Sequence, residues 1–308
     1  MQQFNGFIGW LSPEVQMLLL KEMTLSDLMT FAKTREENKE GVKDYMMKRR
    51  EKLFRTFVND VDGLIEIMDI TGTVISGSSA LSLVQAETEA VNAKDLDVYT
   101  TEGFEDDVVK HFKEKENYIG VQNIVRQQQY DSSAITKIIK LEKRGKKVDI
   151  IVTHWSCAIA PIIQFHTTCV MNYITSRSLV CLYPCWTCAN EGFINPLLYV
   201  DGKTTLYTVD ALMKYTRRGF KLTADPWRLG DHDCEDEATG EEKSGYCPHK
   251  LRSTIDDEVL CWRYAPTQTL AGTTISCESI GIMAWYLGGF QCREGDKEET
   301  MSLLFVSP

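Results

Sequence analysis

The chain has 308 residues, 43% of them hydrophobic and 25% charged, which is the composition of a folded globular protein with a full core. Its formal net charge of −10 argues against a protein that coats DNA or long RNA, because such proteins gain affinity by neutralising phosphates. No apolar segment is long enough to cross a bilayer, and the N-terminus lacks the features of a secretory signal. The chain is therefore expected in the cytoplasm or nucleus, where its ten cysteines would be thiols or metal ligands.

Helices are predicted over residues 1–60. Apolar residues recur there at helical spacing, at Leu11, Val15, Leu18, Leu19 and Met23. Ser12 suits the N-cap and Pro13 the first position of this helix. Two further helices are expected over residues 25–33 and 43–55, and the second of them is highly charged.

Residues 61–160 are predicted to alternate between strands and helices. The expected elements are a strand at 73–75, a helix from Ala80, a strand at 95–100, an amphipathic helix at 105–115, and β-rich segments at 134–141 and 147–153. Lys143-Arg144-Gly145-Lys146 separates the last two segments and suits the turn of a hairpin.

Polar residues interrupt these elements at three places. Gly77 and Ser78 follow the first strand, where glycine allows close approach to a ligand and the following helix N-terminus favours phosphate. Asp95 and Asp97 alternate along a strand, so both carboxylates share one face and repel each other unless a cation lies between them. Asp149 interrupts an apolar strand, where a buried carboxylate without a partner is costly. Mg²⁺ prefers such oxygen ligands together with substrate phosphates.

In order and element type, these residues resemble the DNA polymerase β-like nucleotidyltransferase superfamily over residues 73–153. The resemblance implies that Asp95 and Asp97 bind two divalent metal ions. It also implies that Asp149 helps to hold one ion and positions or activates the attacking hydroxyl, and that Gly77 and Ser78 hold a nucleoside triphosphate such as ATP. The alternative is that the acids only end a strand at the surface and Gly77 only makes a turn.

The N-terminal segment has a second resemblance. Leu11-Ser12-Pro13-Glu14-Val15 and the apolar positions after it look like an F-box, a helical module that docks on the Skp adaptor of cullin ubiquitin ligases. In this chain the module would cover about residues 8–50. The alternative is a helical cap packed on the α/β region, because periodicity cannot separate an exposed apolar groove from a buried one.

Residues 161–308 are apolar and rich in cysteine. A hairpin is predicted over 198–207 with Asp201-Gly202 as its turn, and Thr208 is expected to cap a helix over 210–218. Arg217 and Arg218 could meet a triphosphate, but they equally suit a helix C-terminus. The acidic residues 230–245 are expected to form a surface loop.

Two groups of cysteines have spacings that suit chemistry. Cys185 and Cys188, with Cys181 before them, have metal-ligand or redox spacing, although buried thiols are the simpler interpretation. A candidate Zn²⁺ site is formed by Cys234, Cys247, His249 and Cys261. Their spacing matches no standard zinc finger.

Together these patterns predict an α+β protein with a nucleotidyltransferase-like mixed sheet and flanking helices. The helical segment 1–60 would precede a core over 61–160, and residues 161–308 would complete the fold. The expected activity is Mg²⁺-dependent transfer of a nucleoside monophosphate to a hydroxyl of a protein, small molecule or RNA end. The alternative is a non-catalytic ubiquitin-ligase adaptor that binds its target through the α/β region.

Overall fold

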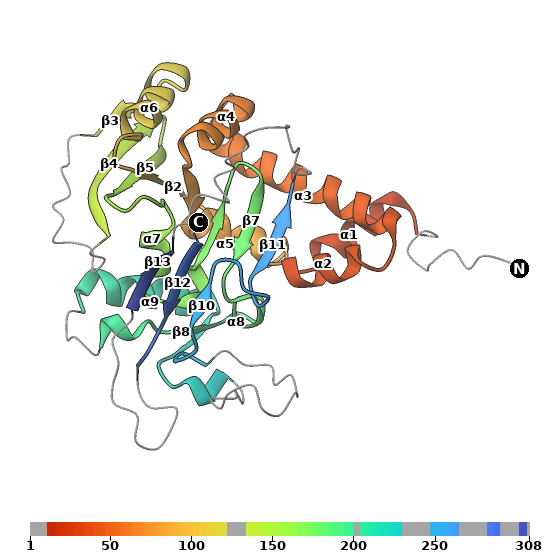
Figure 1. Ribbon diagram of the computed structural model, residues 1–308. Helices are drawn as coiled ribbons and strands as arrows, with labels where there is room; N and C mark the ends of the chain where they lie inside the picture. The colour runs from red at the N-terminus through yellow and green to blue at the C-terminus, as the bar shows by residue number, and fades with distance from the viewer. Residues whose placement is uncertain are drawn as a thin grey trace, which may run out of the picture.

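A computed structural model describes residues 11–121, 134–199, 204–229, 247–264, 282–289 and 302–306. It is a mixed α and β structure in which helices flank a large sheet (Figure 1). The expected α+β class with a mixed sheet and flanking helices is therefore confirmed. Among the described helices, none is both long and apolar enough to span a membrane.

The main sheet has eight strands. Their spatial order is β11 (Leu260–Arg263), β7 (Ser178–Cys181), β6 (Asn172–Ile174), β1 (Val74–Ser76), β2 (Asp95–Thr101), β5 (Lys146–Thr153), β4 (Ile135–Lys143) and β3 (Ile119–Gly120). The β2–β5 pair is parallel, and the other neighbours in this sheet are antiparallel. Two smaller sheets are formed by β10 (Arg252–Ser253), β12 (Ile282–Tyr286) and β13 (Ser302–Val306), and by β8 (Glu191–Phe193) and β9 (Lys221–Thr223).

Three helices lead into the sheet and lie together at the N-terminal side of the molecule (Figure 1). They are α1 (Pro13–Lys21), α2 (Leu25–Ala32) and α3 (Glu36–Phe57). The remaining helices are α4 (Val61–Thr71), α5 (Gly77–Val84), α6 (Glu105–Lys110), α7 (Ala160–Ile163), α8 (Pro184–Cys188) and α9 (Leu206–Arg217). A π-helical turn, His111–Lys115, continues α6.

The alternation of side chains along β2 and β5 divides the core between the two faces of the sheet. Leu96 and Val98 point to one face, where they join a buried cluster with Phe54 of α3 and Met68 of α4. Tyr99 lies in a second cluster on the opposite face. Because Asp95 and Asp97 alternate with Leu96 and Val98, their carboxylates lie on this second face.

The N-terminal helices share the first core instead of standing apart from it. Leu28 of α2 and Phe54 of α3 are fully buried in the same cluster as Leu96. The buried guanidinium of Arg49 donates hydrogen bonds to the carbonyl oxygens of Ser82, at 2.6 Å, and Gln85, at 3.0 Å. These carbonyls lie at the C-terminal end of α5, so a charged group from α3 satisfies acceptors that a helix end leaves open.

Several predicted elements are confirmed with shifted ends, and one is wrong. The hairpin β4–β5 has the expected turn, and α3 extends well beyond the predicted 43–55. Where a hairpin was predicted over 198–207, Leu198 ends a 3₁₀ turn and α9 already begins at Leu206. Asn195 caps the 3₁₀ turn, and Thr205 caps α9 in place of the predicted Thr208, which lies inside the helix. Side chains hydrogen-bonded to the backbone thus favour helical turns here.

Helix α4 was not predicted from the sequence. Asp60 caps it by accepting a hydrogen bond from the backbone N–H of Gly63, and Gly72 ends it with a left-handed φ of 69°. The acidic segment 230–245 and the Asp201-Gly202 turn lie outside the described residues.

Candidate functional site

The three acids singled out by the sequence lie on adjacent strands. Asp97 of β2 is the register partner of Asp149 of β5, and Asp95 pairs with Lys147. Register partners in neighbouring strands project to the same face, so Asp149 shares the face of Asp95 and Asp97. The acids come from segments about fifty residues apart, and the parallel pairing brings them together.

Gly77 brings the first turn of α5 against this pair. Its φ is 65°, in the left-handed region that favours glycine, and a Cβ built there would collide with the Asp97 carboxylate. Ser76, just before it, is the register partner of Asp97 in β1 and donates a hydrogen bond to the carbonyl of Asn172. The strand-to-helix junction expected from Gly77-Ser78 is therefore present and touches the acids.

The proximity of the carboxylates changes their acidity. Burial, with the charges of Asp95 and Asp149, raises the pKa of Asp97 to about 7. Burial also raises the pKa of Asp149, against the opposing charge of Lys140, whose Nζ lies 3.8 Å from the Asp149 carboxylate. The two cations that lower the pKa of Asp97 are Lys214 and Lys140, and they leave it well above the usual value for aspartate. The face thus holds negative charge that its own cations compensate only in part.

Helix α9 supplies cationic groups to the same place. Arg218, which follows its last residue, donates a hydrogen bond from Nη1 to Oγ of Ser78 at 3.0 Å. The Ser78 hydroxyl also hydrogen-bonds with Tyr215, whose ring lies 5.3 Å from the Arg218 guanidinium carbon. Lys214 is exposed, and its charge acts on Asp97. Arg217 and Arg218 thus lie at the C-terminus of α9, as one of the two interpretations of the sequence had it, and Arg218 contacts Ser78 from there.

Lys214 was not singled out from the sequence, and the helix period gives only its relation to Arg218. Residues four apart lie on one face of a helix, so Lys214 and Arg218 project to the same side of α9. Tyr215 on the buried side anchors the helix against Leu81 of α5 and Phe220. The missing signal was the position of α9 in space, which no local pattern gives.

A half-buried histidine adjoins these residues and also was not predicted. The His166 ring centroid lies 5.6 Å from that of Tyr215. Burial and the charge of Lys214 lower the pKa of His166 to about 4, so this imidazole is neutral at physiological pH. Its Nε2 is buried and has no hydrogen-bond partner within the described residues.

Within the described ranges, no group of three or more His, Cys, Asp or Glu side chains is placed to hold a metal ion. Cys234 of the candidate zinc site lies outside those ranges. Cys261 lies on β11, opposite Val180, while Cys247 and His249 precede β10. The zinc site therefore stays a prediction from the sequence.

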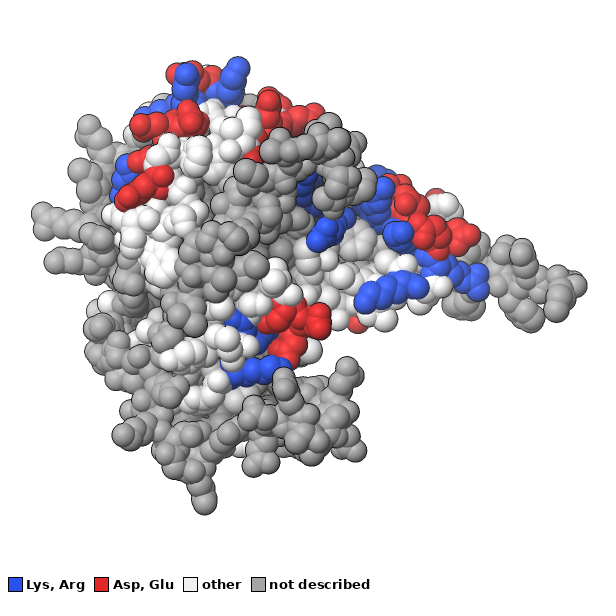
Figure 2. Space-filling view, in the orientation of Figure 1, with Lys and Arg blue, Asp and Glu red and all other residues white. Residues whose placement is uncertain are grey.

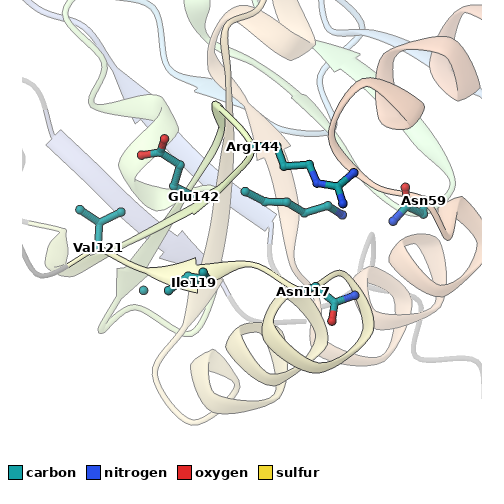
Figure 3. A pocket seen from close by; sticks show the side chains of 8 residues that line it. Asn59, Asn117, Ile119, Val121, Glu142 and Arg144 are labelled. Carbon is teal, nitrogen blue, oxygen red and sulfur yellow. The ribbon is translucent and has the colours of Figure 1, made fainter.

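A cavity of about 660 Å³ opens elsewhere, at the β3 edge of the sheet. Asn59, Asn117, Lys143 and Arg144 line it together with residues of β3, and Figure 3 shows Arg144 and Asn59 on the same side of the opening. Beneath it, the buried Glu116 carboxylate accepts hydrogen bonds from the backbone of Asn59 and from Lys143. The lining contains none of the three acids, so this cavity is separate from the candidate site.

Comparisons with family models, curated proteins and solved structures found no match to this chain.

The Gly77 turn yields a stability prediction. Gly77→Ala should lower the free energy of unfolding by about 2–3 kcal/mol, because alanine is strained at this φ and its Cβ would displace the Asp97 carboxylate. Gly41→Ala is the matched control: Gly41 lies inside α3, and a Cβ added there would meet no atom within 4 Å, so this change should stabilise the protein by up to about 1 kcal/mol. Urea unfolding of both variants measures the difference. Equal stability of Gly77→Ala and the wild type would contradict the assigned turn.

The raised pKa of Asp97 yields a pH-dependent prediction. Its folded pKa of about 7 exceeds the unfolded value, so ionisation destabilises the fold as pH rises toward 7 and the penalty is complete above it. Asp97→Asn should therefore stabilise the metal-free protein by roughly 1–3 kcal/mol at pH 8, after allowance for partial solvent exposure, and by little near pH 4. Thermal unfolding in a chelator at both pH values measures the gain.

Asp44→Asn is the control for this comparison, because Asp44 is exposed on α3 and its change should stay within about 0.5 kcal/mol at either pH. A gain for Asp97→Asn that is the same at pH 4 and pH 8 would show that charge repulsion is not its cause.

Proposed function

We propose that this protein is a Mg²⁺-dependent nucleotidyltransferase that moves a nucleoside monophosphate from a triphosphate to a hydroxyl acceptor. The observation that carries the proposal is the register pairing of Asp97 with Asp149, with Gly77 turning α5 against Asp97. In the alternative, the acids only end a strand at the surface and Gly77 only makes a turn, and the close fit of Gly77 against the Asp97 carboxylate disfavours it. The arrangement unites carboxylates and a phosphate-type helix start, and phosphoryl transfer needs both.

Within the described residues the three acids do not already form a metal-binding group, so the fit to Mg²⁺ rests on their carboxylate chemistry and on the face that they share. Asp95, Asp97 and Asp149 would hold it, since it prefers carboxylate oxygens and keeps part of its shell for water and substrate phosphates. The raised pKa of Asp97 supports this assignment, because it reflects carboxylate charge that a cation would compensate. When bound, the ion would supply neutralisation of the charge on the transferring phosphoryl group.

The triphosphate would lie between α5 and α9. Ser78 and the first backbone N–H groups of α5 offer hydrogen-bond donors at a helix N-terminus. Lys214 is exposed, and Arg218 already contacts Ser78, so both cations can reach phosphate oxygens beyond the turn. Bidentate contacts from an arginine would also fix the orientation of the leaving pyrophosphate.

The acceptor hydroxyl would approach from the β5 side. Asp149 has a raised pKa, which suits a carboxylate that accepts the proton of the attacking hydroxyl. The oxygen then forms a bond to the α-phosphorus while the bond to pyrophosphate breaks. The net charge of −10 disfavours an extended nucleic acid as acceptor. Basic and acidic side chains are intermixed on the described surface seen in Figure 2 and form no broad basic area there.

Nucleotide binding by the full chain tests this proposal without a known acceptor. Calorimetry with each of the common nucleoside triphosphates and Mg²⁺ should detect binding, and Asp97→Asn should remove its Mg²⁺ dependence because a ligand carboxylate is lost. Lys214→Ala should weaken binding about tenfold or more, since it removes a charge-assisted contact. Lys48→Ala on α3 is the control and should leave binding unchanged. The proposal would be overturned if no nucleotide binding is detected, or if neither Asp97→Asn nor Lys214→Ala changes that binding.

A second candidate function, docking on a ubiquitin-ligase adaptor of the Skp type, is favoured by one observation. Helix α1 exposes Leu18 to 60%, Val15 to 40% and Leu19 to 36%, so an apolar stripe faces solvent instead of packing on the sheet. Leu25 and Leu28 of α2 are buried, which holds this stripe on a rigid base. In that case the α/β region would bind the target instead of transferring a nucleotide.

Leu18→Glu separates this alternative from the first. It should abolish binding to a purified Skp-type adaptor while leaving the fold and nucleotide binding intact, because the side chain is exposed. Leu206→Glu is the matched control, since Leu206 is 83% exposed on the distant α9. Absence of a wild-type complex at micromolar concentrations would exclude the adaptor function.

A further inference from the structure

The Cys185–Cys188 pair lies where a strand passes into a short helix. Strand β7 ends at Cys181, Tyr183 precedes α8, and Cys185 and Cys188 occupy the second and last positions of that helix. Cys185 is exposed, Cys188 is partly buried, and Cys181 is buried. All seven described cysteines are outside disulfides. The pair thus consists of one thiol open to solvent and a second one behind it.

The spacing of the pair permits a disulfide. Residues three apart in a helix have Cα atoms about 5 Å apart, which lies within the range that a disulfide spans. Their Cβ atoms are somewhat too far apart in a regular helix, so one backbone position has to adjust. Cys188 is the last residue of α8, and only the turn hydrogen bonds of Ala189 to Trp186 and Asn190 to Thr187 follow it, so an adjustment at Cys188 disturbs at most this last turn.

The rest of α8 is held in place around the two thiols. The Trp186 ring stacks on Tyr183 with centroids 5.5 Å apart and planes 4° apart. The Thr187 backbone donates a hydrogen bond to the carbonyl of Tyr183 at 2.9 Å. The residues between the two cysteines are therefore anchored in the core.

Cys188 also connects α8 to the N-terminal helices. Its thiol hydrogen-bonds with the Ser26 backbone and with the Thr24 side chain, at the start of α2. Thr24 is the N-cap of α2 and forms a capping box with Asp27. Burial raises the pKa of Cys188, so this thiol is a poor first nucleophile, and the exposed Cys185 meets an oxidant before it.

We propose that Cys185 and Cys188 form a redox-active dithiol that a small disulfide such as oxidised glutathione converts to an intrachain disulfide, and that this releases the Cys188 sulfur from the start of α2. The Cys185 thiolate attacks one glutathione sulfur, forming a mixed disulfide and releasing one glutathione thiol. The Cys188 thiolate then attacks the Cys185 sulfur, forming the Cys185–Cys188 bond and releasing the second glutathione thiol. The two protons lost by the cysteines end on the two glutathione molecules.

This pair is independent of the proposed nucleotide chemistry, because it lies on α8 and contacts α2 instead of the acids. Its consequence is structural. Losing the Cys188 contacts weakens the N-terminal turn of α2, which belongs to the helices that share the main core. Oxidation of two cysteines in the C-terminal half of the chain would thus weaken the packing of the N-terminal helices.

Thiol counting on the full-length protein tests the proposal. Cys181, Cys185 and Cys188 lie in one tryptic peptide, residues 178–203, because Arg177 precedes it and Lys203 ends it. After treatment with oxidised glutathione and alkylation under denaturing conditions, this peptide should carry one alkyl group in place of three. Cys188→Ser should keep glutathione attached to Cys185, because the second thiol is missing. Cys185→Ser should keep both remaining thiols alkylatable.

Cys181→Ala is the control, and its oxidised peptide should carry no alkyl group, since the reactive pair is intact. Loss of both thiols in Cys185→Ser would assign the bond to Cys181 and Cys188 and overturn the proposal. A stable glutathione adduct on the wild type would overturn it as well. Hydrogen exchange supplies the second readout: the amides of Ser26 and Asp27 should exchange faster in the oxidised wild type than in treated Cys185→Ser. Equal exchange would refute the link to α2.

Discussion

The parallel pairing of β2 with β5 places two carboxylates side by side, where their charges repel each other. The rest of the candidate site is arranged around this repulsion. Asp97 has to lie beside Asp149, because shifting the pairing of β2 with β5 by one residue would bring Leu96 and Val98 out of the core. Four fully buried apolar side chains, Leu96, Val98, Val148 and Ile150, therefore fix the register that brings the acids together. Burial of the apolar face favours this register by about 25 cal/mol per Å² and opposes the repulsion on the other face.

Three residues make room for this negative charge or partly neutralise it: Gly77, Lys140 and Lys214. Gly77 leaves room for the Asp97 carboxylate, Lys140 lies beside Asp149, and Lys214 lowers the pKa of Asp97 from the other side. The compensation is incomplete, since the pKa of Asp97 stays near 7. A fold that keeps such a site loses stability in the absence of a cation, and proteins tolerate that loss mainly where binding recovers it.

The sequence was most informative where short patterns decide the structure. Alternation identified β2 and β5, and the polar turn identified the hairpin β4–β5 with its boundaries nearly correct. It failed where side chains hydrogen-bonded to the backbone decide, since Asn195 and Thr205 cap helical turns at a predicted hairpin. The distance between segments was a further limit. The acids could be named individually, but only the order of the strands shows that Asp97 and Asp149 are neighbours.

The sequence also could not give the spatial position of the cationic side of the site. It predicted α9 as a helix, but not the part of the fold against which α9 lies. Arg218 reaches Ser78 across 140 positions of sequence, and Tyr215 in the cluster with Leu81 and Phe220 makes that reach possible. Tyr215 is buried, whereas Lys214 before it is exposed and Arg218 after it is half-exposed. Packing of the Tyr215 ring therefore fixes the direction in which both cationic side chains point. The cationic side of the candidate site is thus a product of tertiary packing, whereas the acidic side follows from strand register. Both must form before the groups face each other, and a chain ending at residue 160 would hold the acids and Lys140 but would lack Lys214 and Arg218.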